Sequence, residues 1–329
     1  TVNPTLWDFY ATGAGKDYTR ANGGTVSTAS ATTAEVPWDV YTDDVKSSVA
    51  QYGDAAIVTL SRVGGEGADL SYGEVNYLAL DDNEKSMLEN LASMKKNGEI
   101  KSIIVLINSA NALQVDFLKN NDYDVDAALW IGDVGISGIN AVAQILVGDV
   151  NPSGSLVDTY CYDNYSAPAM WNFTPSVYDG YVEGGDVPAK GSTYMIYQEG
   201  IYVGYKYYET RYEDYVMGAG NAGDYAYGDI VAYPFGYGLS YTNFKFSDMT
   251  VNYNDALDVY TVAVKVTNTG AVAGKRTVQL YVQSPYTDYD KQNGVEKAAV
   301  ALVGFGKTGE LAPGTSEIVT MNVNKRDIA

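Results

Sequence analysis

Three short apolar runs, each followed by a stretch with helical spacing, constrain the fold of this chain more than any other feature. The runs AAIVTL, SIIVLI and AALWI begin at residues 55, 102 and 127. Such continuous apolar runs are typical of strands buried on both faces of a parallel sheet. Alternation of strands and helices at this spacing predicts right-handed crossovers. The first half of the chain is therefore expected to be an α/β domain with a mostly parallel sheet.

The helices between these strands carry clear start and stop signals. Residues 80–98 predict a helix that begins at Asp81 or Asp82 and ends at Gly98, where a left-handed cap is expected. Its apolar face would consist of Met87, Leu88, Leu91 and Met94. A second helix is expected over 137–149, with Ser137 as its N-cap and Gly148 at its end.

The character of the sequence changes twice after residue 150. Residues 161–243 are rich in tyrosine and glycine, show little regular periodicity, and predict a connecting segment. Residues 244–329 contain five short β-rich runs separated by turns such as NTG and LAPG, which predict an antiparallel β-sandwich. A complete sandwich of this kind has about seven strands. We therefore expect an α/β domain at 1–160, the connecting segment, and an incomplete β-sandwich at the end.

Composition excludes several classes of chemistry. The chain of 329 residues has no histidine and one cysteine, Cys161, so it cannot by itself build a Ser-His-Asp triad, a Cys-His dyad or a histidine metal site. Proton transfer must then use Asp, Glu, Tyr or Lys. The net charge of −20 argues against nucleic acid as a partner. No apolar run is long enough to span a membrane. The sequence is compatible with a bacterial cytoplasmic location and with a cell-surface or extracellular one.

The strongest candidate for chemistry is the stretch SRVGGEGADL, which directly follows the first predicted strand. Open α/β sheets bind ligands at the carboxyl ends of their strands, and glycines allow close approach of a substrate. Glu66 lies in the middle of this turn, although a carboxylate there could equally stabilise a helix N-terminus. Arg62 could orient a carboxylate, contact a ligand or form a structural ion pair. Asp69 could be a cap or the ion-pair partner of Arg62.

Polar residues also follow the other two predicted strands. Asn108, Ser109 and Asp133 could border the same site, although each is typical of turns and caps. The GGEG cluster lacks both a following Lys-Ser/Thr and a G-x-G-x-x-G pattern. A phosphate-binding loop is therefore not predicted.

Five stretches, taken in order, resemble the family 3 glycoside hydrolases, the β-glucosidase family. The resemblance covers roughly residues 55–329. The stretches are SRVGGEGADL at 61–70, AALWIGDVGISGINAVAQILVGDVNPSGSL at 127–156, YQEGIYVGYKYYET at 197–210, YPFGYGLSYTNF at 233–244, and VKVTNTGAVAGKRTVQLYV with LVGFGKTGELAPG from 264 onward. It implies an α/β sandwich domain followed by a fibronectin type III-like domain, from a member in which both precede the barrel.

The resemblance also implies a function. Members remove terminal β-linked sugars with retention and use a glutamate of the α/β domain as general acid/base, which by position is Glu66. Arg62 and Asp69 are the candidate substrate-binding residues. The aspartate nucleophile belongs to a (β/α)8 barrel, for which this chain has no room. The expected partners are a carbohydrate substrate and a barrel from the same or another chain, in a hetero-assembly or homo-oligomer. No cofactor or metal is expected.

Other interpretations stay open at this point. The chain could be a non-catalytic carbohydrate-binding or scaffolding fragment, or a nucleotide-binding α/β protein. Within the same family it could belong to a β-xylosidase or an exo-glucanase, which would differ from a β-glucosidase in residues of the barrel.

Overall fold

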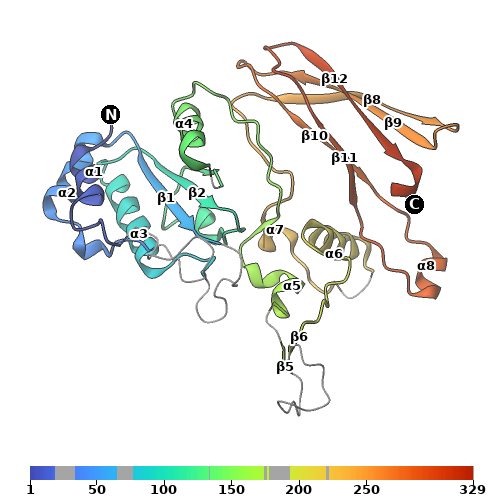
Figure 1. The fold of residues 1–329 in the computed structure, drawn as a ribbon, viewed down its shortest axis with the longest axis horizontal. Coiled ribbons are helices and arrows are strands. Elements are labelled where there is room, and N and C mark those ends of the chain that lie inside the picture. Colours follow the sequence, from blue (N-terminus) through green and yellow to red (C-terminus); the bar gives the residue numbers. More distant parts are fainter. Residues whose placement is uncertain are drawn as a thin grey trace. The chain divides into compact units, whose positions relative to one another are not determined.

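The computed structural model describes residues 1–18, 34–64, 77–132, 134–173, 176–177, 193–219 and 222–328 (Figure 1). The chain forms two compact units, Thr1–Ala143 and Gln144–Ala329. Within the described ranges, no helix has the length and apolar character needed to cross a membrane.

The first unit is built on a three-stranded parallel sheet. Its strands are β1 (Ala56–Arg62), β2 (Ile103–Ser109) and β3 (Ala127–Trp130), in the order β1-β2-β3. Both neighbouring pairs are parallel. All three predicted strands and their parallel arrangement are thereby confirmed, and the carboxyl ends of the strands lie at one edge of the sheet.

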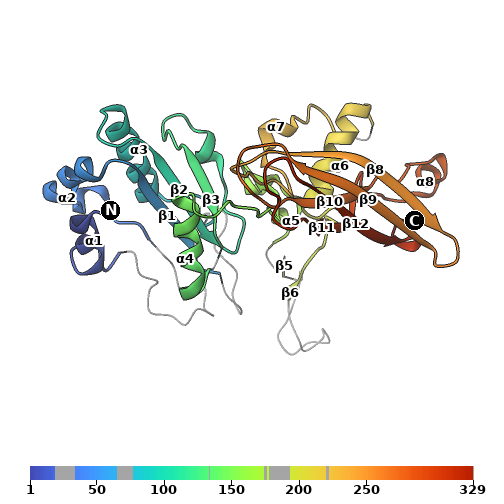
Figure 2. The same ribbon diagram turned by 90° about the horizontal axis from the view of Figure 1, so that it is seen from above.

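Helices cover this sheet and connect its strands. The helix α3 lies on one face and α4 on the other (Figure 2). The helices and 3-10 turns of the unit are α1 (Pro4–Ala11), η1 (Trp38–Val40), α2 (Asp43–Ser48), η2 (Val49–Tyr52), α3 (Asp82–Lys96), η3 (Asp116–Lys119) and α4 (Gly135–Leu146).

The helix α3 follows its sequence signals closely. Asp81 is the N-cap, and the four residues predicted for the apolar face are all buried. Gly98 adopts a φ of +78°, the left-handed conformation expected after a helix end. The prediction for α4 was wrong at its start, because Ser137 lies inside the first turn and not at the cap. Gly132 and Gly135 take positive φ, so the chain turns into the helix earlier than the serine.

Burial differs between the strands of the sheet. The central strand β2 is buried on both faces, with Ile103, Val105, Leu106 and Ile107 all under one-tenth exposed. In β1 burial alternates, and Ile57 is 52% exposed. The expectation that every strand is covered on both faces was therefore wrong for β1 and for the largely exposed β3, which are the two edge strands of the described sheet.

The second unit contains the predicted antiparallel sandwich. Its strands are β8 (Phe244–Asn254), β9 (Val259–Asn268), β10 (Thr277–Val282), β11 (Ala301–Lys307) and β12 (Ser316–Asn324), and helix α8 (Asp288–Asn293) and the turn η5 (Lys325–Ile328) complete it. They form the sheets β12-β9-β8 and β10-β11. The core between the sheets consists of Val264, Val266, Val278, Leu311, Val319 and Met321. All five predicted strands are confirmed.

The tyrosine-rich region contains regular structure that the sequence pattern did not predict. The helix α6 (Tyr205–Met217) begins after Gly204 and ends at Gly218, which is left-handed. Tyrosine has only moderate helix propensity, and the helix lacks a clean apolar stripe, so periodicity gives little signal. Shorter elements surround it: β4 (Tyr160–Cys161), η4 (Asn164–Ser166), α5 (Pro168–Trp171), β5 (Ser176–Val177), β6 (Thr193–Tyr194), α7 (Tyr227–Ile230) and β7 (Val231–Tyr233).

The side-chain amide of Asn151 links the NPSG turn to the YGLSYT stretch. The Asn151 side chain accepts hydrogen bonds from the Ser240 hydroxyl at 2.9 Å and the Tyr241 amide at 2.8 Å. Its Nδ2 group donates to the Ala273 carbonyl at 2.9 Å. A Cβ at Gly238 would lie 2.3 Å from the Gly154 carbonyl oxygen, so only glycine fits there. These motifs form a structural joint within the second unit.

Candidate functional site

The carboxyl end of β1 is organised by a buried arginine. Arg62 is only 5% exposed, and its two terminal nitrogens donate to the two carboxylate oxygens of Glu84, each at 2.7 Å. The same nitrogens donate to the carbonyls of Ser61 at 2.9 Å and Ala79 at 2.6 Å, and Nε donates to the Tyr77 carbonyl. All five N–H donors of the guanidinium are therefore engaged inside the protein.

This geometry favours the structural alternative for Arg62, since no donor is left for a sugar hydroxyl. Among the described residues its ion-pair partner is Glu84. Asp69 and Glu66 both lie outside the described residues. Sequence reasoning did not identify Glu84. The sequence feature that could have pointed to Glu84 is the capping box of α3. In this box the Glu84 carboxylate accepts a hydrogen bond from the Asp81 amide at 2.9 Å, and the same carboxylate binds Arg62.

The same contacts hold together the two flanks of the segment 65–76, in which Glu66 stands. Tyr77, directly after the segment, accepts from Arg62 through its carbonyl, and its hydroxyl accepts from the Val63 amide at 3.1 Å. Directly before the segment, a Cβ at Gly64 would lie 2.3 Å from Asn111 Oδ1, so a larger residue would displace Asn111. Both flanks are thus fixed at the carboxyl end of β1.

Polar contacts also join the ends of the other strands. Asn108, in β2, donates from Nδ2 to the Ser61 hydroxyl at 3.3 Å, and its Oδ1 is a buried acceptor with no partner in the described part of the chain. Ser109 is fully buried and donates to the Asn111 carbonyl at 2.7 Å, so it is a turn residue. Trp130 of β3 donates to the Ser109 carbonyl at 2.9 Å. Asp133 lies outside the described residues.

A half-buried carboxylate, that of Glu35, lies close to the start of α3. One oxygen of Glu35 accepts hydrogen bonds from the hydroxyls of Tyr10 at 3.1 Å and Tyr41 at 2.9 Å and from the Val36 amide at 2.6 Å. Asn83, next to Glu84 in α3, donates to the Glu35 carbonyl at 3.1 Å. Burial, together with the nearby Glu84 charge, raises the pKa of Glu35, and burial raises the pKa of both tyrosines.

The raised pKa of Glu35 gives a pH-dependent contribution to stability. A carboxyl group whose pKa is higher in the folded state favours folding most below its unfolded pKa of about 4.3, and this contribution falls as pH rises through the folded pKa. Glu35→Gln keeps an oxygen acceptor and removes the charge. We expect urea unfolding of this variant to show a weaker loss of stability above about pH 4 than the unchanged chain. A Glu89→Gln control, on the exposed face of α3, should retain the original profile. An identical profile for Glu35→Gln would contradict this account.

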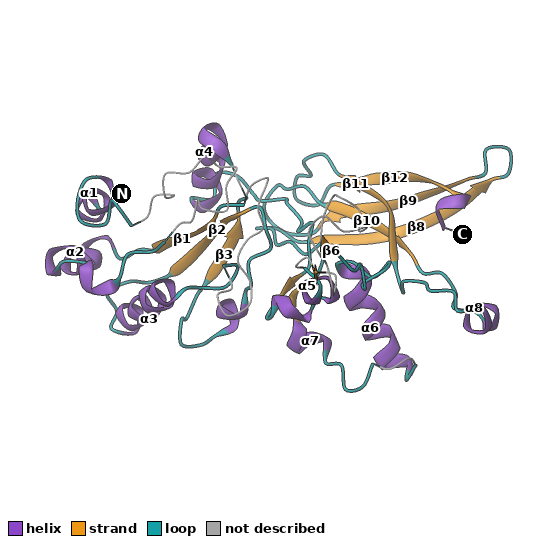
Figure 3. Cartoon of the chain, turned by 60° about the horizontal axis from the view of Figure 1, so that its bottom comes forward, coloured by secondary structure: helices purple, strands orange, loops and turns teal. Residues whose placement is uncertain are grey.

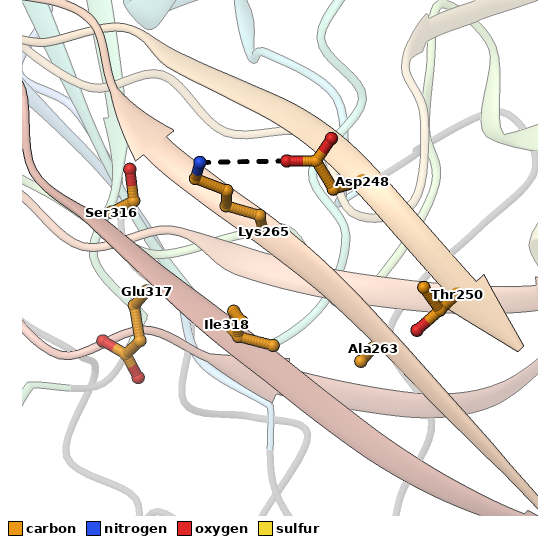
Figure 4. Close-up of a pocket in the computed structure, with 7 residues that line it drawn as sticks. All are labelled: Asp248, Thr250, Ala263, Lys265, Ser316, Glu317 and Ile318. Atoms are coloured by element: carbon orange, nitrogen blue, oxygen red, sulfur yellow. Dashed lines mark ion pairs between the residues drawn. The ribbon is translucent and has the colours of Figure 1, made fainter. Parts of the chain in front are cut away.

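A depression elsewhere in the described structure lacks free catalytic groups. It measures about 490 Å³ and lies on the face formed by β8, β9 and β12 (Figure 4). Its two carboxylates are already engaged: Asp248 pairs with Lys265 at 3.8 Å, and Glu317 accepts from the Gly309 amide at 2.9 Å. Over the described residues, no three Cys, Asp or Glu side chains cluster as metal ligands would.

Comparison with protein families matches both units. Residues 10–205 match the glycosyl hydrolase family 3 C-terminal domain, and residues 276–329 match the fibronectin type III-like domain. The chain is 32% identical over 295 residues to the β-glucosidase of Ruminococcus albus, which covers 90% of this chain and 26% of that protein.

Solved structures show the same similarity. The β-glucosidase 3B of Thermotoga neapolitana, solved with α-D-glucose, is 28% identical with a TM-score of 0.71, and the match covers 99% of this chain and 38% of that one. A β-glucosidase from Paenibacillus barengoltzii is 29% identical with a TM-score of 0.75, over 98% of this chain and 30% of that one. The chain thus spans between about a quarter and two-fifths of the length of these proteins. Because the family model matches more than half of its residues, this chain belongs to the family 3 glycoside hydrolases.

Proposed function

We propose that this chain is the acid/base-bearing part of a retaining β-glucosidase-type enzyme, with Glu66 as the general acid/base. The observation that supports this most is that contacts of Arg62 and Tyr77 fix the two flanks of the 65–76 segment at the carboxyl end of β1. Ligands of open α/β sheets bind at such strand ends.

The proposed reaction has two steps. Glu66 first protonates the leaving oxygen while a nucleophilic carboxylate attacks the anomeric carbon, and it then deprotonates the water that releases the sugar. In retaining enzymes the two carboxyl groups stand about 5–5.5 Å apart. The nucleophile would belong to a barrel domain of the same or another polypeptide. This chemistry uses only carboxyl groups of the protein and water, so the proposal includes no metal or organic cofactor.

The substrate is proposed to be a terminal, non-reducing β-linked sugar, held mainly by the barrel. Under this proposal Arg62 acts through Glu84 and Tyr77 as a positioning residue, whereas Asp69 keeps its predicted role near the sugar. A β-xylosidase or exo-glucanase activity would use the same acid/base and would differ in the barrel.

The test uses the 329-residue chain beside the enzyme that contains it together with a barrel. With 4-nitrophenyl β-glucoside the chain alone should release no nitrophenol, because it lacks the nucleophile. The intact enzyme should first release β-glucose, which proton NMR distinguishes from the α anomer before mutarotation. Turnover by the chain alone, or α-glucose as the first product, would contradict the proposal.

A further inference from the structure

A cavity lined by aromatic side chains lies in the second unit, where α5 and α6 are side by side (Figure 3). Its volume is about 260 Å³, slightly below the roughly 300–1,000 Å³ of pockets for drug-sized ligands. The side chains around it are those of Pro168, Trp171, Gln198, Glu199, Tyr202 and Tyr207. It belongs to neither the strand-end site nor the joint around Asn151.

The base of this cavity rests on buried structure. Tyr207 packs against the core cluster of Cys161, Tyr208 and Val231. The Ser166 hydroxyl, just before α5, lies 3.0 Å from the Tyr208 hydroxyl and ties α5 to α6. Trp171 and Tyr207 are thus carried by two helices that this contact joins, whereas Tyr202 lies just before α6. Helices held by packing reduce the entropy that is lost when a ligand binds.

One of the side chains around the cavity is a largely exposed tryptophan ring. Trp171, the last residue of α5, is 75% exposed. A tryptophan face left in water forgoes the stabilisation that burial of its large apolar area would provide. Such a ring can instead cover the apolar face of a ligand, while the neighbouring polar groups bind its hydroxyls.

The polar groups at the cavity suit a neutral, hydroxyl-rich ligand. Asn172 donates to the Gln198 side-chain oxygen at 2.8 Å, which fixes this amide and leaves its NH₂ group without a partner among the described residues. The Glu199 carboxylate likewise has no hydrogen bond or ion pair within the described part, and it can accept from two hydroxyls. No lysine or arginine lines the cavity, and the chain carries a net charge of −20, so anionic ligands are disfavoured.

We propose that this cavity is an accessory binding site for a neutral pyranoside, with Trp171 stacking on the ring and Gln198 and Glu199 binding its hydroxyls. An aromatic face beside an acceptor and a donor fits a sugar, whose ring has both an apolar face and polar edges. The proposal rests on the proposed function only for the choice of a β-glucoside as probe. The site would retain an oligosaccharide on the enzyme independently of bond cleavage.

Calorimetric titration of the 329-residue chain with cellotetraose tests this proposal. We expect saturable binding with a dissociation constant of about 1 mM, as befits a small and open site. Trp171→Ala should weaken binding about tenfold, and Glu199→Gln about threefold, because a neutral acceptor replaces the charged one. Trp7→Ala is the matched control, since Trp7 is 65% exposed in the other unit, and it should bind like the unchanged chain.

Three results would overturn the proposal: no saturable binding, equal weakening in the Trp171 and Trp7 variants, or equal affinity for an anionic oligogalacturonate. The last result, or binding of polypeptide in place of sugar, would mean that the exposed aromatic surface serves another class of ligand. No bond is cleaved in this assay, so its failure leaves the role of Glu66 untouched. Failure of the hydrolysis test would likewise leave cellotetraose binding intact.

Discussion

Glu84→Ala is expected to destabilise the unit Thr1–Ala143 by about 3–5 kcal/mol. The variant removes both carboxylate oxygens that face Arg62 and leaves a guanidinium buried without a counter-charge. It also removes one half of the capping box at the start of α3. The flanks of the 65–76 segment should loosen at the same time, because Arg62 holds Tyr77.

Urea unfolding of the unchanged chain and its variants measures this effect. Glu89→Ala is the control on the same helix, and it should change stability by less than about 0.5 kcal/mol because its side chain is exposed. The double variant Arg62→Met/Glu84→Leu should be more stable than Glu84→Ala, since apolar residues of similar volume need no counter-charge. A loss in Glu84→Ala no larger than in the control would contradict a stabilising role for the buried pair.

Glu66→Ala, made in the intact enzyme, is expected to lower kcat/KM by about 10²–10⁴-fold for cellobiose. The leaving sugar hydroxyl has a high pKa and depends on protonation as the bond breaks. A dinitrophenolate leaves without such help, so the first step with an activated aryl glucoside should be far less affected. A general acid is identified by the difference between the rate losses for the two substrates, more than by either rate alone.

The control for this experiment is again Glu89→Ala, which should hydrolyse both substrates at the unchanged rate. Equal losses for cellobiose and the activated aryl glucoside in Glu66→Ala would argue against an acid role. Unchanged rates for both would favour the alternative in which this chain only binds carbohydrate or serves as a scaffold.

Much of the fold could be predicted from the sequence, because its signals are local. Helix α3 has a cap, an apolar face and a left-handed end within a single stretch. In the sandwich, a strand such as β9 alternates apolar and polar residues and is bounded by turns. Helix α6 was missed because its tyrosines contact other elements instead of forming one apolar stripe: Tyr205 packs against Phe235 with ring centroids 4.8 Å apart, and Tyr212 packs against Tyr227 of α7 with ring centroids 5.2 Å apart. Such contacts depend on tertiary structure and leave no periodicity in the sequence.

The site shows the same limit. The sequence places Arg62 at the end of a strand and Glu66 four residues later, and the family resemblance supplies a role for the glutamate. The ion pair with Glu84 joins residues 22 positions apart, and nothing in the spacing selects Glu84 over the other acids of α3. The cluster of Tyr10, Glu35 and Tyr41 is likewise assembled by folding. Sequence patterns therefore could not predict which charged and polar side chains pair, because tertiary packing determines those pairs.

The most direct measurement of the central claim is rescue of Glu66→Ala by sodium azide in the intact enzyme. Without its base the variant should accumulate the glycosyl intermediate from an activated aryl glucoside, because water attacks slowly unless it is deprotonated. Azide is already a nucleophile and needs no base, so it should restore turnover and yield β-glucosyl azide, the product of retention. A folded Glu66→Ala enzyme whose turnover does not respond to azide, or whose product is α-glucosyl azide, would contradict the assignment of Glu66 as the acid/base of a retaining glycosidase.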